Sequence, residues 1–359
     1  MVAAERGADR GLAASRGGGN GVVYPIIPSP QSEQAIMKPL SETQSFRVAS
    51  ESEGKRLDLL LVECLGGISR SRIQTLIKAG RVRVDEERAA RPGLRLKGGQ
   101  EILVEAPEAE VATTPAGRPI RTLDVLHDDE HLIVIHKPAG LLVHPTDRVA
   151  GGTVADLAQE RFGELPEVQG QGRAGIVHRL DRLTSGVMVL GRTPEALENL
   201  KLQFKERRVH KTYLALCHGE PRFDNEWVRE PIGIDTRRRD RYRVTDEGEG
   251  REASTLVEVR ERLSGFSFVA AHPKTGRTHQ LRVHLTHLGH PIVGDRVYRH
   301  PGALPVPLPE DAPSMGRQAL HAANLVLNHP GSGQEVSFEA PLPEDMSSLL
   351  EYLRERAQA

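Results

Sequence analysis

One stretch of the chain, residues 175–190, constrains the fold more than any other. It reads GIVHRLDRLTSGVMVL, in which Ile176 and Val177 end one apolar run and residues 187–190 begin another. Most residues between the two runs are polar or charged. This pattern predicts a polar turn between two buried strands.

Asp181 lies in the middle of this predicted turn, among two arginines and two hydroxyl side chains. Charged neighbours keep such a carboxylate ionised, and the apolar strands shield it from bulk water, which suits an active site. The alternative is structural: Asp181 caps the turn and its arginines are solvated. The spacing alone does not separate these two interpretations.

The composition is that of a globular protein. Of the 359 residues, 38% are hydrophobic and 27% are charged, which suits two domains and a tail. No run approaches the roughly 18 to 20 apolar residues of a membrane span, and the N-terminus has no apolar signal core. We therefore expect a cytoplasmic protein without a membrane segment. Cys64 and Cys217 lie in apolar periodic stretches, which favours buried free thiols over a disulfide or a metal site.

The N-terminal third of the chain changes character twice. Residues 1–45 are rich in Gly, Ser, Ala and Arg and predict a disordered tail. Residues 46–105 show two helical periodicities followed by short alternating segments, which predict a compact module of two helices and a small sheet. Residues 106–120 contain three prolines and few large apolar groups, which is typical of a linker.

Residues 121–359 predict one larger domain. Helical patterns are seen near residues 153–162, 194–206, 278–288 and 347–357, and most of the segments between them alternate like strands. Strands outnumber helices, and many of them join locally. We therefore expect an α+β domain with a long, mainly antiparallel mixed sheet and helices packed on it.

The basic residues of the N-terminal module are clustered, although the formal net charge of the whole chain is only −1. Phosphate binding depends on clustering of Lys and Arg on one face rather than on their total number. The second helix and the strand after it carry Arg70, Arg72, Lys78, Arg81 and Arg83. These residues predict an RNA-binding surface, with an ordinary solvated helix face as the alternative.

Four segments resemble, in the expected order, the motifs of pseudouridine synthases of the RluA family. They are HKPAGLLVHP at 136–145, HRLDRLTSG at 178–186, KTYLALCHG at 211–219 and TGRTHQLRVHLTHLGHPIVGD at 275–295. One such motif is a weak signal, whereas four in order are specific. The resemblance implies an enzyme that isomerises uridine to pseudouridine in RNA.

The same resemblance implies roles for individual residues. Asp181 would be the one indispensable catalytic carboxylate. Tyr213 would pack on the target base and assist the final proton removal, although by itself it reads as a core aromatic on a strand. Arg282 would pair with Asp181, and Arg277 is the competitor for that role. Arg179 would enter the space left when the nucleotide is flipped out of its stack.

Residues 56–85 resemble the alpha-L RNA-binding motif of the ribosomal protein S-four type, which often precedes this catalytic domain. The two resemblances together imply RNA as the partner. Large-subunit ribosomal RNA is the first choice of substrate, and transfer RNA is the second. We expect the protein to act as a monomer.

No cofactor or metal is expected, because the isomerisation oxidises nothing and releases nothing. A run of four histidines invites a zinc interpretation, namely His279, His284, His287 and His290. No cysteine pair or carboxylate triad accompanies them, which favours structural histidines or contacts with RNA.

Two other hypotheses remain. A non-catalytic RNA-binding or ribosome-assembly protein could keep the same fold, but it would have no physical need for the motif carboxylate together with Tyr213 and Arg282. A metal-dependent RNA hydrolase is the third hypothesis, and it predicts a cleaved product and inhibition by a chelator.

Overall fold

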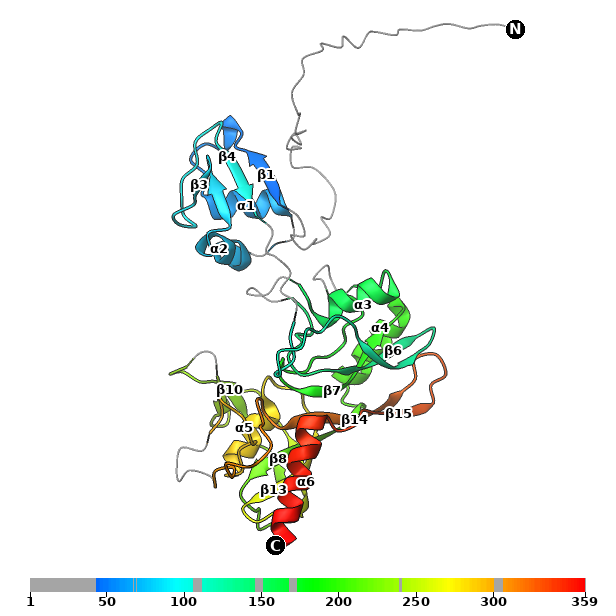
Figure 1. Ribbon diagram of the computed structural model, residues 1–359. Helices are drawn as coiled ribbons and strands as arrows, with labels where there is room; N and C mark the ends of the chain where they lie inside the picture. Colours follow the sequence, from blue (N-terminus) through cyan, green and yellow to red (C-terminus); the bar gives the residue numbers. More distant parts are fainter. Residues whose placement is uncertain are drawn as a thin grey trace, which may run out of the picture.

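The computed structural model describes residues 43–66, 68, 70–105, 112–145, 151–167, 173–238, 241–299 and 306–358. The side chains of Ser71 and Arg72 also lie outside this set. Of the predicted disordered tail, residues 1–42 lie outside the described residues, whereas Gln44 already begins a strand. Figure 1 shows the N-terminal module and the larger domain as two separately folded units.

The N-terminal module contains the two predicted helices and a small antiparallel sheet. Its elements are β1 (Gln44–Arg47), η1 (Ser50–Ser52), α1 (Leu57–Leu65), α2 (Arg70–Lys78), β2 (Val82–Val84), β3 (Glu87–Arg88) and β4 (Glu101–Val104). The strand order is β1-β4-β2-β3. Leu57 and Leu61 of α1, Ile73 of α2 and Ile102 of β4 form the centre of its core. Gly80 takes a positive φ directly after α2, where the sequence predicts the helix to end.

The larger domain is built on one long sheet, as Figure 1 shows. Its strands are β5 (Asp124–Asp128), β6 (Leu132–Lys137), β7 (Ser185–Gly191), β8 (His210–His218), β9 (Asn225–Val228), β12 (Thr255–Arg262), β13 (Phe266–Pro273), β14 (Leu320–Asn328) and β15 (Glu335–Glu339). The order is β5-β6-β7-β14-β8-β13-β12-β9, and β15 pairs with β14. Only the β7–β14 pair is parallel among the strands described. The predicted α+β architecture with a mainly antiparallel mixed sheet is therefore confirmed.

Helices and a small hairpin complete this domain. The helices are α3 (Val154–Phe162), α4 (Pro194–Lys205), α5 (Gln280–His287) and α6 (Glu344–Gln358), and the hairpin pairs β10 (Ile232–Ile234) with β11 (Tyr242–Val244). The start of α4 follows from its sequence, because Thr193 caps the helix and Pro194 fits its first turn. No helix in the described part of the chain is both long and apolar enough to cross a membrane.

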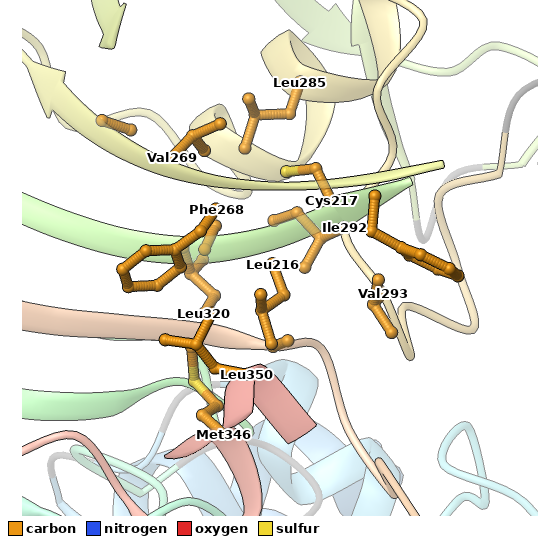
Figure 2. Packing of buried hydrophobic residues seen from close by; sticks show 14 of the residues in the cluster. Leu216, Cys217, Phe268, Val269, Leu285, Ile292, Val293, Leu320, Met346 and Leu350 are labelled. Atoms are coloured by element: carbon orange, nitrogen blue, oxygen red, sulfur yellow. The ribbon is translucent and has the colours of Figure 1, made fainter. Parts of the chain in front are cut away.

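The centre of the sheet is covered by apolar side chains on both faces. Figure 2 shows Leu285 of α5 beside Val269 and Cys217 on one face, and Met346 and Leu350 of α6 against the other. The two faces are filled by alternate residues of β8 and β13, as strand geometry requires. Cys217 is a buried free thiol and Cys64 a partly buried one.

One local prediction differs from the structure. Ile176 makes only an isolated bridge to Leu190, so the polar segment precedes one strand, β7, instead of joining two. Next to this bridge, the backbone N–H of Val189 in β7 donates to Nε2 of the His178 side chain rather than to the backbone of a strand partner.

The predicted linker over residues 106–120 is only partly separate from the larger domain. Residues 106–111 lie outside the described residues. From 112 to 120 the chain folds into a hairpin, in which the N–H of Ile120 donates to the carbonyl of Ala112 at 2.7 Å. Both of these side chains are buried in the core beside β6 and α3. Residues 112–120 pack on the larger domain, instead of forming a separate linker, because the apolar side chains at the two ends of this segment anchor it.

Candidate active site

The loop that carries Asp181 is fixed by hydrogen bonds that its backbone accepts. Nζ of Lys137, a fully buried side chain at the end of β6, donates to the carbonyls of Pro138, Leu141 and Arg182 at 2.9, 2.9 and 3.2 Å. The N–H of Gly140 also donates to the carbonyl of Arg182, at 2.8 Å. Burial lowers the pKa of Lys137 to about 7, although the charge of Asp181 opposes this change. The loop is thus held to the segment after β6.

The following residues are held from the other side. Nη1 of the buried Arg317 donates to the carbonyl of Leu183 at 3.3 Å, and the same guanidinium binds Asp345 of α6 at 2.7 and 2.8 Å. Gly186, at the start of β7, has φ +127°, and a Cβ there would collide with the backbone of Ala322 in β14. A glycine is therefore needed where β7 and β14 approach.

Asp181 itself has few partners. Its Oδ2 accepts from Nη1 of Arg282 at 3.2 Å and lies 3.9 Å from Nε2 of His279, and its side chain is 21% exposed. Nδ1 and the ring of His279 are held by other residues, so the histidine lies beside the carboxylate at a defined distance. Within the described part of the chain, most of the acceptor capacity of the carboxylate is therefore unused by protein groups.

Arg282 is held by a second carboxylate, the side chain of Asp295. Nε and Nη2 of Arg282 donate to its two oxygens at 2.7 and 3.0 Å, and Asp295 also accepts from the N–H groups of Val297 and Tyr298. Burial disfavours the charge of Arg282, but the interactions with Asp295 and then Asp181 outweigh it and raise its pKa. One guanidinium thus bridges a fully buried acid and the partly exposed Asp181.

His279 begins α5 in the left-handed region, with φ +59°, which is unusual for a residue other than glycine. Its Nδ1 lies 2.7 Å from the hydroxyl of Tyr298, and that hydroxyl accepts from the N–H of Tyr242 at 3.0 Å. Burial lowers the pKa of His279, against the raising effect of Asp181. The Tyr298 ring lies over the guanidinium of Arg282, 4.8 Å from its centre. Strained backbone of this kind is often found at functional sites.

These groups line a cavity of about 870 Å³. All five residues predicted for the catalytic domain contribute to its wall, namely Asp181, Tyr213, Arg282, Arg179 and Arg277. Burial, followed by the charge of Asp181, raises the pKa of Tyr213, so its hydroxyl is protonated near neutral pH. The wall also carries the basic residues Lys201, Lys205, Arg207, Lys211 and Lys274. Such a wall attracts a polyanion.

The structure separates the two candidate partners of Asp181. Arg282 contacts the carboxylate, whereas Nε of Arg277 donates to the carbonyl of Glu252 at 2.8 Å. Arg179 is exposed at the wall of the cavity. Both remaining arginines therefore line the cavity, and neither forms a hydrogen bond or an ion pair with the carboxylate among the described residues.

The predicted basic surface of the N-terminal module is only partly available for phosphates. Arg70 binds Asp58 at 3.0 Å and Arg83 binds Glu105 at 3.0 Å, although both arginines remain partly exposed. Lys78 is exposed and Arg81 is partly buried. The side chain of Arg72 lies outside the described residues.

Three of the four histidines that suggested zinc bond to other groups, namely His279, described above, His284 and His290. His284 bonds to Oγ1 of Thr255 and to the carbonyl of Glu230, at 2.9 and 3.1 Å, and His290 to the carbonyl of His218 at 3.1 Å. Within the described ranges, no group of three His, Cys, Asp or Glu side chains is arranged to hold a metal ion.

No role was predicted for three residues that shape this site: Lys137, Asp295 and Tyr298. His279 was expected only as a structural histidine or a contact with RNA. Asp295 ends one of the motif segments, and Lys137 lies inside another, so their positions carried a signal. Tyr298 lies beyond every motif, and only the fold brings its hydroxyl to His279.

Comparisons with known proteins agree with this geometry. Residues 131–287 match the family described as RNA pseudouridylate synthase, and residues 55–102 match the S4 domain. An uncharacterized RNA pseudouridine synthase of Synechocystis is 40% identical over 310 residues, which cover 86% of this chain and 92% of that protein. Ribosomal large subunit pseudouridine synthase D of Neisseria meningitidis serogroup A is 40% identical over 333 residues, 91% of this chain and 87% of that one.

The solved structure of human RNA Pseudouridylate Synthase Domain Containing 4 is similar as well. It is 28% identical, with a TM-score of 0.50 over 64% of this chain and 93% of that chain. Fold, sequence and site together define an RNA-modifying isomerase with an N-terminal S4 domain. The chain belongs to the RNA pseudouridine synthase family.

Proposed function

We propose that this enzyme converts uridines of large-subunit ribosomal RNA to pseudouridine, with Asp181 as the catalytic carboxylate. The observation that carries the proposal is the position of this side chain: it is anchored on one side by Arg282, while its other acceptor positions face a basic cavity. The substrate class is inferred from similar proteins, several of which are named ribosomal large subunit pseudouridine synthase D.

The reaction breaks the bond between C1′ of the ribose and N1 of the base, turns the base, and joins C1′ to C5. The proton on C5 then leaves, and a proton is placed on N1, so the composition of the nucleotide does not change. In our proposal Asp181 acts at the ribose, and Arg282 holds its carboxylate in place for that step. Attack on C1′ and removal of the C2′ proton are two ways in which a carboxylate beside the ribose can act.

Other residues handle the base. Tyr213 lies in the same cavity as Asp181, and its protonated hydroxyl and ring suit packing on the detached uracil. In the proposal this tyrosine also assists the loss of the C5 proton to solvent water, while its own hydroxyl stays protonated. Arg179, exposed at the wall, fills the space in the RNA that the flipped uridine leaves.

We assign the proton of His279 to Nε2. The hydroxyl of Tyr298 accepts from the N–H of Tyr242 and therefore has its own proton to donate to Nδ1 of the imidazole. Nε2–H then points toward Oδ2 of Asp181, 3.9 Å away. His279 thus acts as a positioning residue that presents a neutral donor beside the carboxylate.

The N-terminal S4 domain binds the RNA outside the catalytic cavity in this proposal. Lys78 and the exposed parts of Arg70 and Arg83 contact phosphates there, together with Arg72 and Arg81. The protein acts as a monomer in the cytoplasm, where ribosomes are assembled.

The substrate is tested directly with purified protein. Transcripts of large-subunit ribosomal RNA and of transfer RNAs are incubated with the enzyme, and pseudouridines are mapped at single-nucleotide resolution. The proposal predicts new pseudouridines in the ribosomal transcript. Modification of transfer RNA alone would overturn the proposed substrate. Binding of ribosomal RNA without any pseudouridine would instead favour a non-catalytic assembly protein.

A further inference from the structure

A second, smaller cavity adjoins the catalytic one and has no role in the reaction described above. Its volume is about 240 Å³, and Trp227, Leu256 and His272 form part of its wall. It shares three residues with the catalytic cavity, namely Lys211, Pro273 and Lys274. The two cavities therefore meet along one rim.

The register of the sheet places the second cavity on the face opposite to Tyr213. Trp227 of β9 lies opposite Leu256 of β12, which lies opposite His272 of β13, so their side chains share one face. Tyr213 lies opposite Ala271, one residue before His272, and therefore points to the other face. The shared rim lies where β8 begins and β13 ends, so a strand of RNA can pass around this end of the sheet from one cavity to the other.

Trp227 has the surroundings of a stacking platform. It is the one tryptophan of the chain, its side chain is among the exposed large apolar side chains, and the residue is 37% exposed. The guanidinium of Arg229 lies over its ring, 5.2 Å from the centre. An aromatic ring that is open to solvent beside basic groups is how proteins hold single-stranded RNA, because every base can stack on it.

Lys211 and Lys274 supply positive charge at the rim. Among the described residues, neither ammonium group has a carboxylate within ion-pair distance. Burial and then the positive charge of Lys274 lower the pKa of Lys211 to about 8. A phosphate between the two ammonium groups would relieve this repulsion.

The acidic residue of this cavity, Glu258, does not cancel that charge. Its Oε2 lies 3.0 Å from Nη2 of Arg260 and 3.3 Å from Nε2 of His272. The carboxylate is therefore paired within the wall, and the rim keeps its positive charge.

We propose that the second cavity is a nucleotide-binding subsite, which takes a nucleotide neighbouring the target uridine, with its base on Trp227 and its phosphate between Lys211 and Lys274. The inference rests on the proposed function in one respect, namely that the catalytic cavity holds a uridine of an RNA strand. The subsite adds a contact with the RNA outside the reacting nucleotide. This contact would contribute to the selectivity of the enzyme for one RNA segment over another.

The single tryptophan allows a direct test. The full-length Asp181→Asn variant is titrated with a short single-stranded oligouridylate, while tryptophan emission and the anisotropy of the labelled oligonucleotide are followed together. Stacking on Trp227 predicts saturable quenching with the same midpoint as the anisotropy. Saturable binding without quenching would overturn the subsite, as would an emission change that follows protein concentration rather than RNA.

Substitutions sharpen the test. Trp227→Ala should weaken oligouridylate binding by about 5- to 100-fold, whereas Trp227→Phe, which keeps a ring, should stay within about threefold. Ile234→Ala is the matched control, because Ile234 is exposed but lines neither cavity. Binding by Trp227→Ala as tight as by this control would contradict the proposal. Lys274→Ala should reduce the slope of log affinity against log salt by about 0.7.

The outcomes also separate this inference from the proposed function. In otherwise wild-type protein, Trp227→Ala should raise KM for the RNA and leave kcat within about twofold, because the subsite binds substrate and transition state equally. Quenching without any pseudouridine formation would support the subsite and contradict the proposed function. Pseudouridine formation without any change in tryptophan emission would support the function and contradict the subsite.

Discussion

Asp58 in the N-terminal domain and Asp181 in the catalytic domain are both acids among arginines, but their oxygens have very different partners. Asp58 accepts from Nε and Nη2 of Arg56 at 2.9 and 3.0 Å, from Arg70 at 3.0 Å and from Gln74 at 3.0 Å, and its side chain is fully buried. Among the residues that the structure describes, Asp181 has one such contact, to Arg282 at 3.2 Å, and it faces a cavity.

The difference shows what an acid among arginines can be used for. When side chains of the protein occupy the acceptor positions of a carboxylate, as around Asp58, the carboxylate joins helices α1 and α2 and has nothing left for a ligand. When one anchored arginine holds the carboxylate and the rest of it is open, as at Asp181, the group can act on a substrate. Neighbouring residue types alone do not distinguish the two cases.

The largest combined effect is expected for Arg282→Leu. It removes the anchor of Asp181 and also leaves the buried Asp295 without its guanidinium, so we expect a loss of about 3 to 5 kcal/mol in unfolding free energy and of at least about 10²-fold in activity. Chemical denaturation and pseudouridine assays measure the two effects. Arg282→Lys is the control, because it keeps the positive charge but not the planar guanidinium that donates to both carboxylates. It should lose less stability than Arg282→Leu. Unchanged stability in Arg282→Leu would contradict the bridging role.

Asp58→Asn should lower the stability of the N-terminal domain and leave the rate of pseudouridine formation nearly unchanged. Replacing the acid removes the buried negative charge to which Arg56, Arg70 and Gln74 donate. We therefore expect the unfolding free energy of the N-terminal domain to fall by about 2 kcal/mol. Hydrogen exchange of α1 and α2 in the full-length protein measures this loss. Activity on an oligonucleotide too short to reach the N-terminal domain should stay within about threefold. A large loss of activity on that substrate would contradict the claim that Asp58 has only a structural role.

Acid should act on the N-terminal domain through the same residue. Hydrogen bonds from Arg56 hold the pKa of Asp58 well below its usual range, despite its burial. A depressed folded-state pKa contributes stability that is complete above the unfolded pKa, near about 4, and is lost as the pH falls toward the folded value. Hydrogen-exchange protection of α1 and α2 should therefore decline below about pH 4 in the wild type and much less in Asp58→Asn. Equal declines would assign the acid sensitivity to other groups.

The smallest effect is expected for Tyr298→Phe. The change removes the hydroxyl partner of His279 but keeps the ring over Arg282, so kcat should fall by about 2- to 10-fold, the equivalent of one hydrogen bond. Burial raises the pKa of Tyr298 to about 12, so the hydroxyl is protonated throughout the neutral range and the loss should not depend on pH there. A full loss of activity would mean that Tyr298 has a chemical role.

The sequence was sufficient for the elements and for the main residues of the cavity, because both are encoded locally. Thr193 and Pro194 predict the start of α4, and the motif segments contain Asp181, Tyr213 and Arg282. Three kinds of feature could not be predicted. The first is local: Ile176 was expected in a strand, but a side chain of the same segment took the backbone donor of Val189.

The two other kinds depend on contacts between distant residues. The ion pair of Arg70 was not expected, because its guanidinium reaches back twelve positions to Asp58. Tyr298 was not expected at the site, because its contact with His279 exists only after α5 and the loop beyond it have packed. Pairing across the fold, unlike periodicity, leaves no pattern in a single sequence.

The central claim is tested most directly by single-turnover pseudouridine formation with Asp181→Asn and Asp58→Asn, measured side by side on the same short RNA. We predict that Asp181→Asn loses at least about 10⁴-fold in rate while its unfolding free energy stays within about 1 kcal/mol of wild type, because one partly exposed contact is lost. Asp58→Asn should keep its rate. A wild-type rate in Asp181→Asn, with folding intact, would contradict the account.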